Sequence, residues 1–404
     1  MLFTLNDLAA VAMKQKLKDV SDHAIELTRT SFVFDLMTGM EGAGFSAPDS
    51  ALGWFGKPTT YWIDLPKLLE GGFNALCFDM GDWLPPAMTI DFSDPRARRW
   101  HEPILRGDPD WSNFAWPPEE YRFLAFRHYD YHPRRSPLAQ ALTWYELVAR
   151  EIEANAERML LARSARDILL AQKQGKIAVL LTGNTIQMIE DSLEVLRVLY
   201  RLGYRIMLLS RAGRNLVADS WIETRADSKL TTLGLAVVTE LNHLGMLIDV
   251  SHLGDRCFYD VLEHSSSPVI ASHCNARALC NHPRNLSDDQ ARALADKGGV
   301  IGLTFGNPVF IDLHYNGEAV PSELRYSVDS PLFQKWLDHC DHFVELIGID
   351  HVAIGSDGGP DLFRDVSEQT PRIVEGLIRR GYGDHDIKKI IGENALRIVQ
   401  QVIG

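Results

Sequence analysis

The feature that most constrains the fold of this chain is the alternation of short apolar runs with longer helical patterns. The runs predicted as strands are residues 31–36, 75–79, 177–181, 205–209, 246–250, 268–271, 299–304 and 352–355. Strands that alternate with helices are typical of repeated βα units, which build a parallel sheet covered by helices. Eight such units predict an α/β fold, a (β/α)8 TIM barrel that takes up residues 1–404 as a single domain.

Helical periodicity fills the intervals between these runs. Apolar residues recur at three- and four-residue spacing over residues 142–161 and again over 189–202, where Gly203 provides a stop. Two further helices are predicted at 371–379 and 385–403. We expect these last helices to close the barrel from outside.

One region, residues 81–137, breaks the pattern. It follows the second predicted strand and is rich in proline, tryptophan and charge, for example at 83–86, 110–118 and 129–133. A long insertion without regular structure in a compact domain usually carries a function. Two interpretations stay open, a loop over the barrel mouth and a surface arm used for dimer packing.

Composition excludes several classes of partner. The chain has 404 residues, 46% of them hydrophobic and 24% charged, as in an ordinary globular protein. A net charge of -13 argues against nucleic acid and anionic membranes as partners. We expect no signal peptide, because a basic stretch followed by an apolar one is not seen in the first residues, and no apolar run approaches the roughly 20 residues of a membrane span. Its five scattered cysteines lack CxxC spacing, which predicts reduced thiols in a cytoplasmic protein. We also expect a homo-oligomer.

Three of the predicted strands lead into a side chain that can bind a metal ion. The runs that begin at residues 246, 268 and 352 end in His252, His273 and Asp357. In a barrel of parallel strands these positions meet at the C-terminal rim, where such enzymes keep their chemistry. Two imidazoles and a carboxylate there predict a hydrolytic metal site, with all three residues as ligands and as catalytic groups.

The order of several segments resembles the membrane dipeptidase (renal dipeptidase) family, peptidase family M19 of the amidohydrolase superfamily. The segments are residues 193–203, 218–221, 240–252, 268–273, 283–285, 354–357 and 392–397. The resemblance implies a TIM barrel that hydrolyses dipeptides with two zinc ions. It places His252 and His273 on metal-binding histidines and Asp357 on an aspartate that contacts metal and substrate. Arg284 falls on the arginine that pairs with the substrate carboxylate, and we expect its neighbour Asn285 to bind substrate too.

The sequence also departs from the family pattern at its metal ligands. The family's first strand ends in a His-x-Asp pair, for which one register offers Met37 and Gly39 and another offers Val33 and Asp35. In either register the histidine is missing.

Further departures lie after the third, fourth and eighth predicted strands. Thr182 takes the place of the glutamate that bridges the metals, and Arg211 that of a substrate-contacting histidine. Gly359 replaces a second aspartate. We therefore expect one zinc ion, or none, in place of two.

Three interpretations remain open. In the first, zinc sits on His252, His273 and a carboxylate, most plausibly Asp357, with Asp35 or Asp79 as reserves. A single metal-activated water then hydrolyses a dipeptide or related small amide, whose carboxylate Arg284 and Arg211 bind. The second is a metal-free lyase, isomerase or tailoring enzyme that uses the histidines as acid and base, favoured by the positive charge of Arg211. The third is a non-catalytic protein that binds a small carboxylate-bearing molecule.

Overall fold

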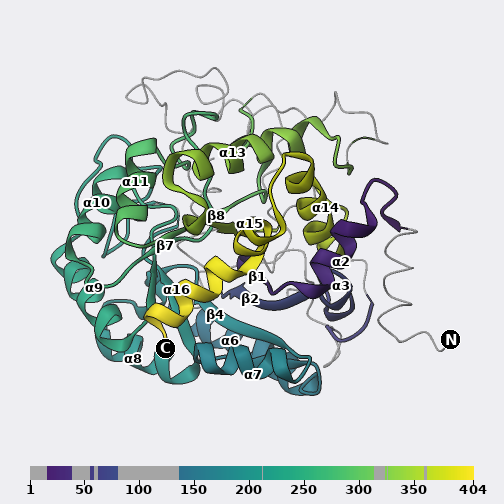
Figure 1. Cartoon of the computed structure of the whole chain (residues 1–404). Coiled ribbons are helices and arrows are strands. Elements are labelled where there is room, and N and C mark those ends of the chain that lie inside the picture. Colours follow the sequence, from purple (N-terminus) through teal and green to yellow (C-terminus); the bar gives the residue numbers. More distant parts are fainter. Residues whose placement is uncertain are drawn as a thin grey trace, which may run out of the picture.

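The computed structural model describes residues 16–38, 55–58, 62–80, 136–211, 213–313, 324, 326–358 and 362–404. Within these residues a nine-stranded parallel sheet lies at the centre of the molecule (Figure 1). Its strands are β1 (Val33–Thr38), β2 (Phe73–Asp79), β3 (Met159–Leu161), β4 (Ile177–Gly183), β5 (Tyr204–Leu208), β6 (Leu247–Asp249), β7 (Ile270–Ala271), β8 (Val300–Leu303) and β9 (Val352–Ile354).

The sheet closes into a barrel of eight strands. Its order is β2-β1-β9-β8-β7-β6-β5-β4, and the pairing of β2 with β4 completes the circle. The additional strand β3 pairs with residues 177–179 of β4, whereas β5 pairs with residues 181–183. All eight predicted strands are present, and the predicted (β/α)8 TIM barrel is confirmed.

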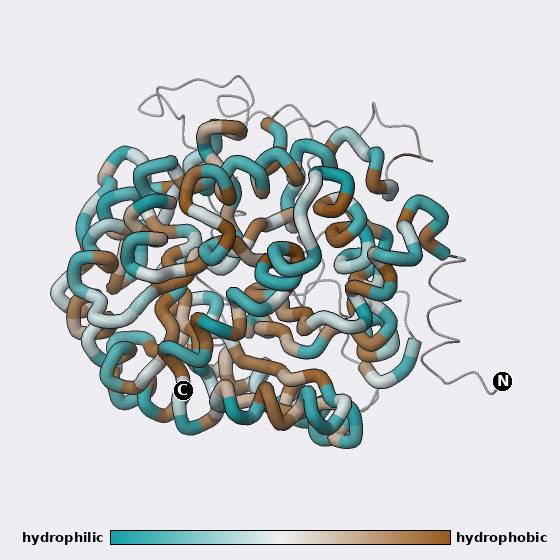
Figure 2. Tube along the Cα trace, viewed as in Figure 1, coloured by the Kyte–Doolittle hydropathy of each residue, from teal (hydrophilic) through white to brown (hydrophobic). Residues whose placement is uncertain are grey.

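Helices surround the barrel in Figure 1, and Figure 2 shows the contrast between the apolar strands and the more polar helices outside them. The helices of the described residues are α2 (Asp22–Thr30), α3 (Leu65–Glu70), α6 (Pro137–Ala154), α7 (Ala165–Lys173), α8 (Leu193–Leu202), α9 (Thr232–Leu244), α10 (Asp255–His264), α11 (Asp288–Asp296), α13 (Pro331–Ile347), α14 (Val366–Arg379), α15 (Asp384–Lys388) and α16 (Asn394–Val402). Short 3₁₀ segments are η3 (Ile186–Ile189), η4 (Pro308–Phe310) and η5 (Ile349–His351), and η6 (Lys389–Glu393) is a π-helical turn.

The helix predicted over residues 142–161 differs from the structure at both ends. Helix α6 begins at Pro137, after the N-cap Ser136, and ends at Ala154. Residues 159–161, which we assigned to the same helix, form β3 instead, because their backbone pairs with the edge of β4. The apolar spacing suited both structures, and tertiary pairing decided between them.

The other predicted helices keep their type but shift their limits. Helix α8 begins at Leu193 rather than at 189, because the Ser192 hydroxyl caps it by accepting from the amide of Val195. Helix α14 begins before Pro371 and continues through it. The segment predicted at 385–403 is divided by η6 between α15 and α16.

Apolar side chains pack in two regions, between the barrel and its helices and inside the barrel. We call the inside group the lumen cluster. Its strand residues are Phe34, Leu36, Ala75, Cys77, Ala178, Leu180, Ile206, Leu247, Ile270, Val300 and Ala353. Above them Gly302 and Gly355 face the carbonyl of Ser272, and a Cβ would lie 2.0 Å and 1.7 Å from that oxygen, respectively. Only glycine permits the Ser272 carbonyl to come this close to the neighbouring backbone. This contact fixes the position of the end of β7 along the barrel axis.

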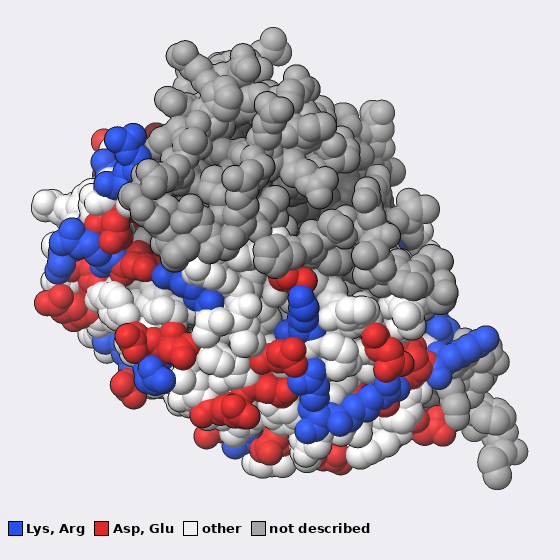
Figure 3. Space-filling view, turned by 90° about the horizontal axis from the view of Figure 1, so that it is seen from above, with Lys and Arg blue, Asp and Glu red and all other residues white. Residues whose placement is uncertain are grey.

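The outer surface carries charges of both signs. Figure 3 shows lysine and arginine interleaved with aspartate and glutamate over the described surface in that view. In the described part of the chain, no helix has both the length and the apolar character needed to traverse a bilayer. All five cysteines are buried and none forms a disulfide, as expected. Residues 81–135 of the predicted insertion lie outside the described residues, and its last residue, Pro137, starts α6.

Candidate metal centre

The ends of β6 and β7 bring His252 and His273 together at the barrel rim. Their Nε2 atoms lie 2.9 Å apart, and the two rings are tilted by 53° with centroids 5.0 Å apart. His273 is buried and His252 is half-buried. The convergence that the strand ends predicted for these two residues is therefore present in the structure.

The tautomer of His252 follows from the partner of its other nitrogen. Nδ1 lies 3.0 Å from the backbone carbonyl oxygen of Arg211, which can only accept a hydrogen bond. The proton of the neutral ring must therefore sit on Nδ1. Nε2 is left with a free lone pair, which faces His273.

A serine and an aspartate set the tautomer of His273 in the same way. Its Nδ1 lies 2.6 Å from Ser272 Oγ, and the Ser272 hydroxyl donates its proton to the Asp249 carboxylate. Ser272 Oγ therefore accepts from His273, whose proton lies on Nδ1. The aspartate is fully buried and its other oxygen accepts the amides of Ser251 at 2.9 Å and Ser272 at 3.0 Å.

With both rings in these tautomers, two lone pairs face each other across 2.9 Å. Such an arrangement is repulsive unless a cation lies between them. Two nitrogen ligands of one tetrahedral zinc ion stand about 3.3 Å apart, close to this separation. In metal-binding histidines, the ring nitrogen that does not bind the metal typically donates to a backbone carbonyl or to a carboxylate. His252 donates to a carbonyl in this way, and His273 is linked to a carboxylate through Ser272. The pair and its supports therefore fit one metal ion.

Burial and neighbouring charge keep both rings neutral. Burial lowers the pKa of His252 and of His273 well below the ordinary value, and the positive charges of Arg284 and Arg211 lower both further. Neutral imidazole is the form that binds a metal. His252 also has a left-handed backbone, with φ of 67°, which only the surrounding contacts can hold.

Asp357 lies after β9 with an equally unusual φ of 54°. Its amide donates to the carbonyl of Met37 at 2.7 Å, and the residue is half-buried. Burial raises the pKa of its carboxyl group, and the charges of Arg211 and Arg284 oppose that rise. The carboxylate therefore shares the electrostatic environment of the histidine pair.

A third ligand is not in place among the described residues. Among these residues, no carboxylate, histidine or cysteine brings a ligand atom within 4.8 Å of the ligand nitrogens of both His252 and His273. Asp357, the predicted third ligand, does not meet this distance either. The ligand-type group that does meet this distance is on α10 and consists of Asp260, Glu263 and His264. Lys229 already supplies the cation there, 2.7 Å from Asp260 and 3.6 Å from Glu263.

The reserve ligand Asp35 is directed away from the rim histidines. Its neighbours Phe34 and Leu36 belong to the lumen cluster, so strand alternation points Asp35 outward. One oxygen accepts the amides of Met37 and Ser356, and the other accepts Gln369 Nε2 of α14 at 3.0 Å. Asp35 thus joins β1, β9 and α14.

The other reserve, Asp79, lies at the end of β2 and pairs with an arginine. Its Oδ2 accepts a hydrogen bond from Asn184 Nδ2 and stands 3.7 Å from Arg211 Nη1. Thr182, at the position of the family's bridging glutamate, is fully buried and lies opposite Asp79 in the β2–β4 register. The positive charge of Arg211 is therefore already matched by a carboxylate. Gly39 and Gly359 lie outside the described residues.

Arg284 lies against the backbone of His273. Nη2 donates to the His273 carbonyl at 2.7 Å and Nη1 to Cys274 Sγ at 3.0 Å. The side chain is 3% exposed, and its Nε has no hydrogen-bond partner among the described residues. No described carboxylate lies within 4.0 Å of this guanidinium. A buried arginine of this kind is suited to binding an anion.

Asn285 braces the loop that carries Arg284. Its Nδ2 donates to the carbonyl of Cys280 at 3.0 Å and to that of Phe310 at 2.8 Å. Oδ1 is buried without a hydrogen-bond partner among the described residues. This oxygen is thus the polar atom of Asn285 that is left to accept a hydrogen bond.

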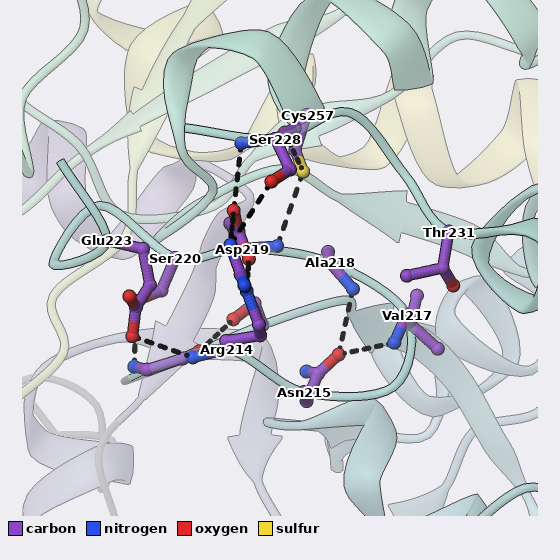
Figure 4. Close-up of polar contacts among 12 residues, drawn as sticks. Arg214, Asn215, Val217, Ala218, Asp219, Ser220, Glu223, Ser228, Thr231 and Cys257 are labelled. Atoms are coloured by element: carbon purple, nitrogen blue, oxygen red, sulfur yellow. Dashed lines mark hydrogen bonds and ion pairs between the residues drawn. The ribbon is translucent and has the colours of Figure 1, made fainter. Parts of the chain in front are cut away.

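The residues that support the histidines were not among the predicted site residues. Asp249 and Ser272 had a detectable signal, because each interrupts an otherwise apolar strand next to a candidate ligand. In the loop after β5, drawn in Figure 4, residues 218–221 belong to the family resemblance, but nothing in the sequence indicates that Asp219 pairs with Arg214 or that this pair supports His252.

Comparison with known proteins identifies the family of this chain. The family model for membrane dipeptidase (peptidase family M19) matches residues 97–403. Dipeptidase verJ of Clonostachys rogersoniana is 31% identical over 360 residues, which are 84% of this chain and 84% of that protein.

Solved structures share the fold. A metallopeptidase from Rhodobacter sphaeroides, liganded with a phosphinate mimic of the dipeptide L-Ala-D-Ala, superposes with a TM-score of 0.72 at 22% identity, over 92% of this chain and 99% of that one. The probable dipeptidase PvdM from Pseudomonas aeruginosa gives a TM-score of 0.70 at 24% identity, over 94% and 97%. The chain therefore belongs to the membrane dipeptidase family, peptidase family M19, whose members are metal-dependent hydrolases.

Proposed function

We propose that this protein hydrolyses a dipeptide, or a related small amide with a free carboxylate, using a single metal ion held by His252 and His273. The observation that carries the proposal is the opposition of two Nε2 lone pairs at 2.9 Å, each fixed by a partner on Nδ1. A zinc ion held by these two nitrogens would supply Lewis acidity for amide hydrolysis.

The remaining rim residues take roles that suit their surroundings. Arg284 binds the substrate carboxylate, because it is buried and lacks a carboxylate partner among the described residues. Asp357 has a raised pKa caused by burial, so it can hold and release a proton beside the scissile amide. An alternative role for Asp357 is that of third metal ligand. This role requires its side chain to move toward the two histidines.

Arg211 is the main point where this site differs from the family pattern. Its guanidinium pairs with Asp79, which offsets its charge, and its carbonyl accepts Nδ1 of His252, so Arg211 orients a ligand. The rim charge that favours an anionic substrate is therefore that of Arg284. At the rim, the described residues offer no further group of ligand-type side chains for a second metal ion, and the group on α10 already pairs with Lys229.

The test compares each dipeptide in a panel, including those with a C-terminal D-residue, with the same dipeptide amidated at its C-terminus. We expect the wild-type kcat/KM to be about 10- to 100-fold higher for the free acid, the range of a hydrogen bond to a charged group. Arg284→Met should remove that preference. Arg197→Met, which breaks a bidentate pair with Glu240 between α8 and α9, should keep it. Equal kcat/KM values for the free acid and the amide in the wild type would refute the carboxylate-binding role of Arg284. Turnover that persists in the presence of a chelator would refute the metal-dependent mechanism.

A further inference from the structure

The loop between β5 and α9 contacts the His252 segment at three places. The Arg211 carbonyl accepts Nδ1 of His252, and the Trp221 amide donates to the His252 carbonyl at 2.9 Å. Two residues after His252, the Gly254 amide donates to the Asp219 carbonyl at 3.0 Å. Residues 220 and 253 form an antiparallel bridge between these bonds. The loop therefore holds both the ring and the backbone of His252.

The conformation of this loop depends on the side chain of Asp219 (Figure 4). The carboxylate is 3% exposed and accepts a bidentate pair of hydrogen bonds from Arg214, at 2.5 Å from Nε and 2.9 Å from Nη2. It also accepts the Ser228 amide at 2.8 Å. The Asp219 side chain thus joins the first part of the loop, at Arg214, to its last part, at Ser228.

Cys257 of α10 completes the attachment. Its Sγ accepts the Asp219 amide at 3.3 Å and donates to the Ser228 carbonyl at 3.0 Å. The loop is therefore fixed to the helix that follows His252. A displacement of Asp219 would shift the Trp221 and Gly254 contacts directly. It would reach the Arg211 contact on the ring through the hydrogen bond from the Gly213 amide to Ser220 Oγ at 2.8 Å.

We propose that Asp219, held by Arg214, is a positioning residue that fixes the backbone and the ring tautomer of His252. This role of Asp219 rests on the proposed function, because it requires His252 to be a metal ligand. His252 has a left-handed backbone, which its own sequence does not favour, so the external bonds must maintain it. Supporting groups of this kind typically change metal affinity 10- to 100-fold when removed.

The experiment compares Asp219→Asn with the wild type in the full-length protein, and Glu240→Gln serves as the control. Asparagine keeps the shape but places an NH₂ group against N–H donors. Glu240 also accepts a bidentate arginine pair, from Arg197, but lies between α8 and α9 away from the rim. Zinc affinity is measured by competition with a chromophoric chelator, and urea unfolding of the metal-free proteins measures stability.

We expect Asp219→Asn to raise the zinc Kd about 10- to 100-fold and Glu240→Gln to leave it within twofold. Arg214→Lys keeps the charge without the bidentate fork and should give an intermediate Kd; it also replaces Asp219→Asn if that variant fails to fold. A zinc Kd within twofold of wild type in both loop variants would overturn the inference.

A second readout does not need the metal. In the metal-free protein, ¹⁵N NMR of histidine side chains should show His252 protonated on Nδ1, with the signal assigned by its loss in His252→Ala. We expect mixed tautomers at His252 in Asp219→Asn. Absence of zinc from the wild type would overturn the proposed function, whereas an unchanged His252 tautomer in Asp219→Asn would overturn the positioning role.

Discussion

Removal of the Ser272 hydroxyl should weaken both the fold and the metal site. In Ser272→Ala, the buried Asp249 carboxylate loses its Ser272 hydroxyl donor and keeps its two amide donors. His273 Nδ1, now 2.6 Å from Ser272 Oγ, is left without an acceptor. Alanine fits the space, so the change is chemical rather than steric.

The magnitude follows from the two lost bonds. A hydrogen bond to a charged group contributes about 1.5–3 kcal/mol and a neutral one about 0.5–1.5 kcal/mol. We expect the free energy of unfolding of the metal-free protein to fall by about 2–4 kcal/mol in Ser272→Ala. Loss of the relay that orients His273 should raise the zinc Kd about 10- to 100-fold.

Urea unfolding measures the first effect and chelator competition the second. Ser265→Ala is a matched control, because Ser265 is 4% exposed and its hydroxyl donates to the Ser267 carbonyl at 2.8 Å, after α10. The control should lose stability but keep its zinc Kd. If Ser272→Ala binds zinc as tightly as the control does, the assignment of the His273 tautomer is wrong.

Three other outcomes follow from the structure. His339 is buried, its Nδ1 accepts the Ala276 amide and its Nε2 donates to the Ile311 carbonyl, and burial lowers its pKa to about 4. Because the unfolded chain binds a proton at this residue near pH 6.5 and the folded chain does not, His339 should contribute a fall of about 3 kcal/mol in the free energy of unfolding as pH drops from 6.5 to 4; His339→Asn should lessen the dependence of the free energy of urea unfolding on pH over that range, and an unchanged slope would contradict the assignment. A Cβ at Gly355 would lie 1.7 Å from the Ser272 carbonyl oxygen, so Gly355→Ala should cost at least about 3 kcal/mol in urea unfolding, and a wild-type value would show that the barrel can open there. Zinc at 100 times its Kd should stabilise the protein by about 2.7 kcal/mol, a gain that a chelator reverses and that variants lacking either rim histidine do not show.

The sequence was sufficient to predict the barrel because each strand is a separate apolar run with a helix after it. It also predicted the meeting of His252 and His273, since parallel strands end at the same rim. Strand β3 was missed because its three residues extend an apolar spacing that suits a helix equally well. Only its pairing with β4 distinguishes the two structures, and that contact is not local in the chain.

Asp35 shows a second limit. Its position beside an apolar run made it a reserve ligand, but the side to which it points depends on which neighbours enter the barrel. The lumen cluster includes Phe34 and Leu36, so Asp35 faces α14. The supports Asp249, Ser272 and Asp219 escaped prediction for a related reason, because their roles arise from partners on other elements.

The most direct test of the account is the metal content of the protein, purified without added metal or chelator and measured by elemental mass spectrometry. The opposed lone pairs of His252 and His273 predict close to one metal ion per chain, lost in His252→Ala and in His273→Ala. Two ions per chain would contradict the single-metal site. No metal in a folded wild-type protein would contradict the proposed hydrolytic mechanism itself.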